Sequence, residues 1–325
     1  MPSRPKTIAD WLAWALRRYA RHKVALGQVA DNAHDEALYL ALHTLELPLE
    51  SPRSVLRRQP TPQQAAKLAE VFRRRIEERV PAAYLTREAW LGGHKFFVDE
   101  RVIIPRSYFV ELLPEIADIV ECRAGSPDLA AKGNGLAKKA GSGDPALHGA
   151  PRRAVKRVVD VCTGSGCLAV LLADCFPEAK VDAIELSPDA AAVARFNFAQ
   201  NQLGARIKLH RSDVFDAVPA ARYDVILSNP PYVPTREMRD LPEEFRKEPA
   251  MALDGGRDGL DVVRKLLRQA RERLQPHGIV TLEVGQARPA LERAFAELDP
   301  HWLHTADGED CVCVITAARL RAWRS

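Results

Sequence analysis

A short motif, Ser228-Asn229-Pro230-Pro231-Tyr232, follows the apolar run from Val225 to Leu227. Consecutive prolines restrict the backbone and cannot donate hydrogen bonds, so we expect the carbonyl of Pro230 to point into a site. That oxygen and the side-chain oxygen of Asn229 would together accept two hydrogen bonds from one planar –NH2 group. Tyr232 adds an aromatic face on which an amide or a base can pack. The motif predicts that Asn229, Pro230, Pro231 and Tyr232 hold a reacting amine.

A second candidate is the glycine-containing segment at residues 160–166, which follows a β-branched run. Glycine lets the backbone approach a ligand, and the start of the next helix presents free N–H groups. A nicotinamide site would use a similar turn, but its third glycine is replaced by Leu168 or Ala169 and an acidic residue precedes the glycines. Asp160 suits a cationic sulfonium ligand that carries an ammonium group. The predicted contacts are Asp160, Thr163, Gly164, Ser165 and Gly166.

Two further carboxylates follow predicted strands. Glu185 ends the next strand, where a carboxylate can accept hydrogen bonds from both hydroxyls of a ribose. Asp213 follows the third strand and is placed to accept a hydrogen bond from an adenine amino group. Either carboxylate alone is as typical of an ordinary loop or helix cap as it is of a ligand site. Together with Asp160, at three successive strand ends, they favour an adenosine-containing cofactor.

The elements that must position these residues are short β-branched runs separated by helical patterns. The runs lie at residues 158–161, 181–184, 207–210, 225–227 and 279–284. Such alternation predicts a parallel sheet with helices on both faces, and a ligand site beyond the carboxyl ends of the strands.

The rest of the chain predicts additional parts. Helical spacing of apolar residues at 7–80 indicates three or four helices, with a capping box at Thr61 and Gln64. Residues 89–104 have the pattern of a hairpin, broken at Gly92-Gly93. Residues 123–154 contain too few apolar side chains to form a core. We therefore expect an N-terminal helical substrate-recognition domain at 1–86, a hairpin and connector at 87–122, a disordered insertion at 123–154, and a cofactor-binding domain at 155–325.

Composition excludes several classes of protein. The 325 residues are 46% hydrophobic and 28% charged, as in ordinary soluble proteins, and the longest apolar stretches are far too short for a membrane span. Arginines follow the first apolar residues, the wrong order for a secretory signal, so we expect a cytoplasmic protein. The net charge of +4 comes from basic excesses in residues 1–80 and 123–157, typical of a solvated helix face or of a surface for a ribonucleoprotein. We expect Cys311 and Cys313 to be core residues, and no metal site.

The glycine turn combined with Asn-Pro-Pro-Tyr resembles the S-adenosylmethionine-dependent amino methyltransferases, and the chain outside 123–154 resembles their protein-glutamine branch. Within that branch it is similar to the enzymes that methylate large-subunit ribosomal protein three. The stretches that carry this likeness are residues 31–37, 84–86, 98–102, 104–107, the turn at 160–167 with its paired cysteines, 241–253 and 258–260.

The resemblance implies a Rossmann-like class I methyltransferase fold with a mostly parallel seven-stranded sheet, a small N-terminal helical domain and a connecting β-hairpin. It implies that S-adenosylmethionine is bound by Asp160, Thr163, Gly164, Ser165, Gly166, Glu185, Asp213 and Asn229. Arg106 and Glu111, which match the family pattern, would position the substrate. The implied partner is large-subunit ribosomal protein three, alone or within an assembling particle.

Three other functions remain open at this point. The release-factor glutamine methyltransferases differ only in branch motifs. An enzyme that methylates an adenine amino group would use the same amine site, although no added base-recognition domain is visible and sequence-specific DNA binding is not expected. A ribosome-assembly factor that lacks catalysis would keep the fold, but the intact glycine turn, Asp213 and Asn229 argue against it.

Overall fold

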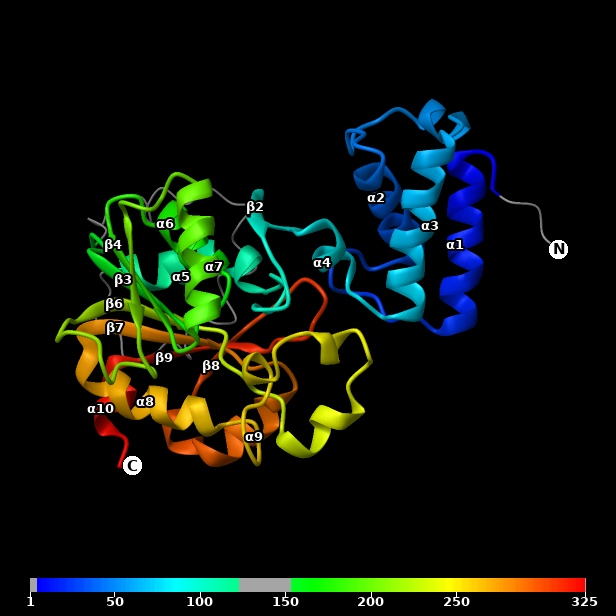
Figure 1. Ribbon diagram of the computed structural model, residues 1–325. Coiled ribbons are helices and arrows are strands. Elements are labelled where there is room, and N and C mark those ends of the chain that lie inside the picture. Colours follow the sequence, from blue (N-terminus) through cyan, green and yellow to red (C-terminus); the bar gives the residue numbers. More distant parts are fainter. Residues whose placement is uncertain (1–4, 123–152, 325) are drawn as a thin grey trace, which may run out of the picture. The chain divides into compact units, whose positions relative to one another are not determined.

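A computed structural model describes residues 5–122 and 153–324 (Figure 1). The chain divides into two compact units. The first unit contains the residues up to Arg106 together with Glu237–Ala252, and the second contains Ser107–Arg236 and the residues from Leu253 onward. The predicted insertion at 123–154 lies outside the described residues, apart from its last two positions.

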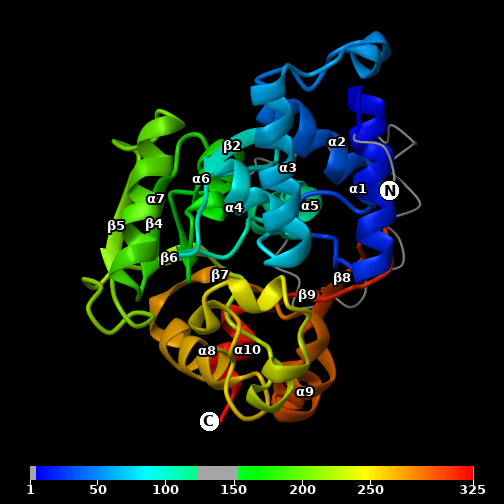
Figure 2. The ribbon, with the colours of Figure 1, turned by 45° about the vertical axis from the view of Figure 1, so that its right-hand side comes forward.

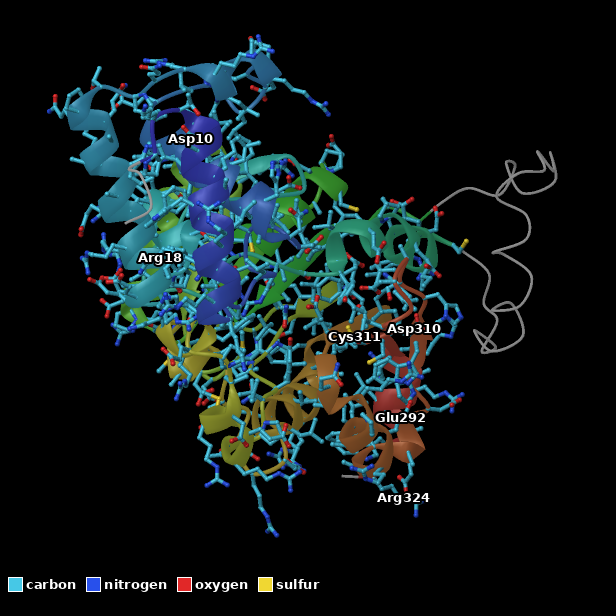
Figure 3. All side chains as sticks on the ribbon, turned by 90° about the vertical axis from the view of Figure 1, so that its right-hand side faces the viewer. Asp10, Arg18, Glu292, Asp310, Cys311 and Arg324 are labelled. Atoms are coloured by element: carbon cyan, nitrogen blue, oxygen red, sulfur yellow. The ribbon has the colours of Figure 1, made fainter. Side chains whose placement is uncertain are left out.

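Three helices form the core of the first unit: α1 (Ile8–His22), α2 (Ala33–Thr44) and α3 (Pro62–Glu77). They lie side by side in both ribbon views (Figures 1 and 2). Helix α1 begins with a capping box between Thr7 and Asp10, whose side chain is labelled in Figure 3. Helix α3 begins with the predicted capping box of Thr61 and Gln64. Each helix buries its apolar face in one shared cluster that includes Trp11, Leu40, Leu68 and Phe72.

Shorter elements complete the first unit: η1 (Arg53–Arg57), α4 (Ala82–Thr86), β1 (Glu88–Leu91) and β2 (His94–Phe97). Strands β1 and β2 pair antiparallel, and the predicted glycine turn at Gly92-Gly93 has positive φ at both residues. Strand pairing ends at Phe97, so the expectation that the hairpin extends to residue 104 was wrong. The reason is a turn in which the amide of Val102 donates to the carbonyl of Asp99.

The segment Glu237–Ala252 is anchored in the first unit by a buried carboxylate, Glu244. Its Oε1 atom accepts hydrogen bonds from Arg75 Nη1 at 3.3 Å, from Arg79 Nη1 at 2.9 Å and from the amide of Ala25 at 3.1 Å. Because a buried charge is costly unless it is paired, these donors hold the segment in the unit. Its short helices are η3 (Thr235–Asp240), η4 (Phe245–Lys247) and η5 (Ala250–Ala252).

A second buried carboxylate, Glu248, anchors the same segment four residues later. It accepts hydrogen bonds from Arg106 Nη1 at 2.9 and 3.0 Å, from the amide of Ile104 at 3.2 Å and from Gln28 Nε2. The guanidinium of Arg106 also lies over the ring of Phe245, 5.1 Å from its centre. Segment and unit are thus joined at two charged positions.

A seven-stranded sheet forms the centre of the second unit, with strand order β5-β4-β3-β6-β7-β9-β8. The five strands from β5 to β7 are parallel and the last two pairings are antiparallel, which confirms the predicted mostly parallel sheet. The strands are β3 (Arg157–Val161), β4 (Lys180–Glu185), β5 (Ile207–Arg211), β6 (Tyr223–Ser228), β7 (Leu274–Glu283), β8 (His301–Leu303) and β9 (Val312–Thr316).

Helices cover both faces of this sheet, as predicted. One face carries α5 (Phe109–Glu121), α6 (Cys167–Cys175) and α7 (Pro188–Gln200). The other carries α8 (Asp261–Arg273), α9 (Arg288–Ala294) and α10 (Ala317–Ala322), with the short η6 (Gly285–Ala287) and η7 (Ala296–Leu298) beside them (Figures 1 and 2). Cys311 and Cys313 are buried at β9, which confirms their predicted place in the core; Figure 3 labels Cys311 beside Asp310.

Among the described residues, no helix combines the length and the apolar character needed to cross a membrane.

Candidate active site

The strand order places the candidate residues at one edge of the sheet. Strand β3 pairs with β4 on one side and with β6 on the other. Successive strands are therefore added on opposite sides of β3, and in parallel sheets ligands bind beyond the carboxyl ends of the strands at such a point. In register, Asp160 lies between Ala183 and Leu227. Glu185 and Ser228 are the last residues of β4 and β6. The structure therefore brings the glycine turn, Glu185 and the Asn-Pro-Pro-Tyr motif to the same edge.

The glycine turn between β3 and α6 is closely packed. The hydroxyl of Thr163 donates to Asp160 Oδ2 at 2.5 Å, and the amide of Gly166 donates to the carbonyl of Thr163 at 2.8 Å. Gly164 and Gly166 have φ of 55° and 86°, the left-handed region that favours glycine. A Cβ atom on Gly166 would lie 2.4 Å from the ring of Phe198 in α7, so a side chain cannot fit there.

Asp160 is fully buried, and its Oδ1 atom has no hydrogen-bond partner among the described residues. Burial raises the pKa of this carboxyl to about 7, the bond from Thr163 opposes that rise, and the nearby charge of Glu185 adds to it. A buried polar atom without a partner is costly, and it suits a site that receives a donor from a ligand. A cationic group at this position would supply the missing hydrogen bond and lower the pKa of Asp160.

Glu185 connects the glycine turn to the start of α7. One of its oxygens accepts from the amide of Gly164 and the other from the amide of Ser187, both at 2.8 Å. Burial raises the pKa of Glu185, and the backbone amides oppose that rise. An ionised carboxylate has about four acceptor positions, so each oxygen can accept a further bond from a ligand hydroxyl.

Two other predicted residues have different surroundings. The Ser165 hydroxyl is buried and has no hydrogen-bond partner in the part of the chain that the structure describes, while the Ser165 carbonyl accepts from Asn197 Nδ2 at 2.9 Å. Asp213 follows β5, is half exposed, and forms an ion pair of 2.7 Å with Lys265 of α8. Ser165 therefore has unused hydrogen-bonding capacity inside the turn, whereas Asp213 shares its charge with a lysine.

In the Asn-Pro-Pro-Tyr motif, Pro230 is buried and its three neighbours are partly buried. The side chain of Asn229 is oriented, because its Nδ2 atom donates to Glu283 Oε1 at 3.0 Å. Beyond the motif, the amide of Val233 donates to the carbonyl of Leu253 at 2.9 Å, and the amide of Gly255 donates to the carbonyl of Val233 at 2.8 Å. The chain that returns from the first unit thus pairs directly with the end of the motif.

Three glycines that the sequence analysis did not assign to the site surround this motif. A Cβ atom on Gly255 would lie 2.7 Å from the carbonyl oxygen of Pro231, and one on Gly259 would lie 2.2 Å from that of Tyr232. A Cβ atom on Gly285 would lie 2.6 Å from the Tyr232 ring. These distances are far below van der Waals contact, so only glycine lets the backbone and ring take their observed places.

Glu283 is the other residue that the sequence analysis missed. It ends β7, and the pairing of Ser228 with Leu282 places Asn229 next to it. A carboxylate directly after a buried apolar strand was the signal that identified Glu185, and the same signal is present at residues 279–284. Among the described residues, no group of histidine, cysteine, aspartate and glutamate side chains is arranged to hold a metal ion.

Arg106 and Glu111, the predicted substrate-positioning pair, fall in different units. Arg106 is bound to Glu248 within the first unit. Glu111 lies in the first turn of α5, and its Oε1 accepts from the amide of Ala306 at 3.3 Å within the second unit. Both side chains therefore have contacts inside their own units, and a role in substrate binding stays a prediction.

Comparison with known proteins places the chain in a family. Residues 147–256 match the family described as Methyltransferase small domain. Three relatives are each named ribosomal protein uL3 glutamine methyltransferase. That of Burkholderia pseudomallei is 44% identical, covering 99% of this chain and 98% of the relative; that of Bordetella pertussis is 44% identical, covering 97% and 96%. That of Neisseria gonorrhoeae is 40% identical, covering 97% and 95%. With this identity over nearly its whole length, and with the site geometry described above, the chain belongs to the family of the ribosomal protein uL3 glutamine methyltransferases.

Proposed function

We propose that this protein transfers a methyl group from S-adenosylmethionine to the side-chain amide nitrogen of a glutamine in ribosomal protein uL3, the large-subunit ribosomal protein three. The observation that carries the proposal is the Asn229 carboxamide at the strand edge that also holds Asp160 and Glu185. Such an edge can bind a cationic adenosine cofactor beside a planar amide. The names of the full-length relatives supply the acceptor protein.

The residues at the edge fit S-adenosylmethionine. Asp160 Oδ1, which no described residue contacts by a hydrogen bond, suits the ammonium group, and Glu185 suits the ribose hydroxyls. The left-handed glycines of the Gly164–Gly166 turn would let the ligand approach the backbone closely. We propose that Thr163, Ser165, Asp213 and Asn229 complete this site. The cofactor supplies an electrophilic methyl group on a sulfonium.

The chain's own residues must overcome the weak nucleophilicity of an amide nitrogen, whose lone pair is delocalised into the carbonyl. We propose that Asn229 Oδ1 and the Pro230 carbonyl accept the two hydrogen bonds of the substrate –NH2 group. Two fixed acceptors hold the nitrogen in line for attack and stabilise the positive charge that develops on it. Tyr232 packs against the amide plane. A general base is not required before attack, because the proton becomes acidic only as the N–C bond forms, and it is then lost to water.

The test is methylation of a defined acceptor. The purified protein is incubated with labelled S-adenosylmethionine and uL3, offered both free and within ribosomal particles, and the modified residue is located by mass spectrometry. We expect one methylated glutamine in uL3, and no transfer to a uL3 variant in which that glutamine is replaced by asparagine. Transfer to a release factor or to RNA in parallel reactions, with none to uL3, would overturn the assignment. We also propose a cytoplasmic location, because ribosomal proteins are made in the cytoplasm.

The raised pKa of Asp160 predicts that cofactor affinity depends on pH. Below about pH 7 the carboxyl is increasingly protonated and cannot pair with an ammonium group. Lowering the pH from about 7.5 to about 6 should therefore weaken S-adenosylmethionine binding roughly tenfold, as measured by calorimetry. The control is Asp160→Asn, which has nearly the same shape but cannot ionise; it should bind more weakly at the higher pH and show a much flatter dependence. Equal pH dependence in both proteins would contradict the proposed pairing.

A further inference from the structure

The carboxamide of Asn229 has two ends of nearly equal size but opposite hydrogen-bonding character. Oδ1 only accepts and Nδ2 only donates, so rotating the group by half a turn exchanges the two roles. A substrate –NH2 group can be held only if Oδ1 faces it. The site therefore needs something that selects one of the two orientations.

Glu283 is placed to make that selection. Its Oε1 atom is 3.0 Å from Asn229 Nδ2, and the residue is only 5% exposed. An ionised carboxylate accepts hydrogen bonds and cannot donate them, so it attracts Nδ2 and repels Oδ1. The contact follows from the sheet, since the β6–β7 register pairs the preceding residues, Ser228 and Leu282.

The other oxygen of Glu283 is held from the opposite side. Glu283 Oε2 accepts from the hydroxyl of Ser107 and from the amide of Tyr108 at 3.1 Å. The Ser107 oxygen in turn accepts from the amide of Phe109, the first residue of α5, at 3.1 Å. Donors on both sides fix the rotation of the carboxylate. Glu283 is thus itself oriented by the segment that begins α5.

We propose that Glu283 is a positioning residue that fixes the Asn229 carboxamide with Oδ1 toward the acceptor amide; this deepens the proposed function and rests on it. Glu283 acts through Asn229 and does not touch the acceptor. Ser107 and Tyr108, in the predicted connector, donate to the other oxygen of Glu283 and so help to hold it in place.

The test variant is Glu283→Gln, which keeps the size of the side chain. The amide of Tyr108 and Asn229 Nδ2 are both donors, and a glutamine presents only one acceptor oxygen, so one of the two contacts is lost. We expect turnover with a glutamine acceptor to fall about 10- to 100-fold, with S-adenosylmethionine affinity by calorimetry unchanged within about twofold. The fall should be smaller than that of Asn229→Ala, because the carboxamide still samples the productive orientation. If Glu283→Gln is not folded by circular dichroism, Glu283→Asp, which is too short to bridge both sides, replaces it.

A double-mutant cycle separates positioning from a merely structural role. In an Asn229→Ala background the Glu283→Gln change should have almost no further effect on turnover, because its target is gone. Ser107→Ala removes one of the two donors to the other oxygen and leaves the Tyr108 amide in place, so it should lower turnover by only a few-fold.

Two results would overturn the proposal: parental turnover in folded Glu283→Gln, or a full effect of that change in the Asn229→Ala background. If the parental protein does not methylate glutamine at all, the proposed function fails. The double-mutant cycle is then measured with the amine acceptor that the protein labels in a cell lysate. If the protein labels none, the cycle is measured on the free energy of unfolding. In that case, the absence of coupling between positions 229 and 283 overturns the proposal that Glu283 orients Asn229.

Discussion

Replacing Asn229 by alanine is expected to lower the rate of glutamine methylation by about 100- to 1000-fold, the effect of removing one oriented contact to a transition state. The variant loses one of the two acceptors proposed to hold the substrate –NH2 group. The residues proposed to hold the ammonium group and the ribose of the cofactor, Asp160 and Glu185, make their contacts to the glycine turn and are unchanged in this variant. Calorimetry should therefore detect S-adenosylmethionine binding close to that of the parental protein.

The same experiment includes a control for damage to the backbone of the motif. Gly285→Ala places a Cβ atom 2.6 Å from the Tyr232 ring, so it displaces the motif without removing an acceptor atom. We expect it to weaken acceptor binding as well as turnover, whereas Asn229→Ala should act mainly on turnover. Near-parental turnover of a folded Asn229→Ala protein would mean that the amide is held by other groups, and the mechanism would have to be abandoned.

Replacing Arg75 by methionine is expected to lower the free energy of unfolding by about 3–5 kcal/mol, the usual cost of breaking a buried ion pair on one side. The guanidinium is fully buried and pairs with Glu36 through Nε at 2.7 Å and Nη2 at 3.1 Å, and with Glu244 at 3.3 Å. It also donates to the carbonyl of Ala25 at 2.6 Å. Methionine fills part of the volume but leaves two carboxylates buried with fewer donors. Urea denaturation followed by circular dichroism measures the loss.

The matched control for this change lies on the same helix. Arg73 is exposed and pairs with Glu70 at 2.8 Å and Glu78 at 2.7 Å, both of which are also exposed. Arg73→Met should lower the free energy of unfolding far less than Arg75→Met does, because water replaces what an exposed pair loses. Similar costs for the two variants would show that burial of the Arg75 cluster contributes little to stability.

Local patterns were enough to predict the central sheet and the residues at its edge. Asp160, Glu185 and Asn229 each lie at or just beyond the end of a buried β-branched run, and parallel strands bring their carboxyl ends together. Their roles toward a ligand stay predictions. Glu283 follows the same rule, yet nothing in the sequence distinguishes it from an ordinary carboxylate at a strand end. Its contact with Asn229 depends on which strands are neighbours, and strand order is a property of the whole chain.

The charge cluster of the first unit was beyond sequence reasoning for a different reason. Arg75 lies in a helical segment rich in exposed arginines, where a solvated helix face is the ordinary interpretation. Its partner Glu244 is 169 residues away, in a segment that leaves the second unit after the Asn-Pro-Pro-Tyr motif. Periodicity shows which helix face is polar, but it does not show that a distant carboxylate buries one of those charges.

The excursion of Glu237–Ala252 into the first unit has a consequence for how this protein can be recombined. The chain passes between the units three times, after Arg106, after Arg236 and after Ala252. Consider a chimera of two relatives with a single junction at Arg106. It would combine the helices of one relative with the segment 237–252 of the other, so Glu244 and Glu248 would no longer face their own donors. A functional chimera must therefore exchange residues up to 106 and residues 237–252 together, because these two separate stretches of sequence form one structural unit.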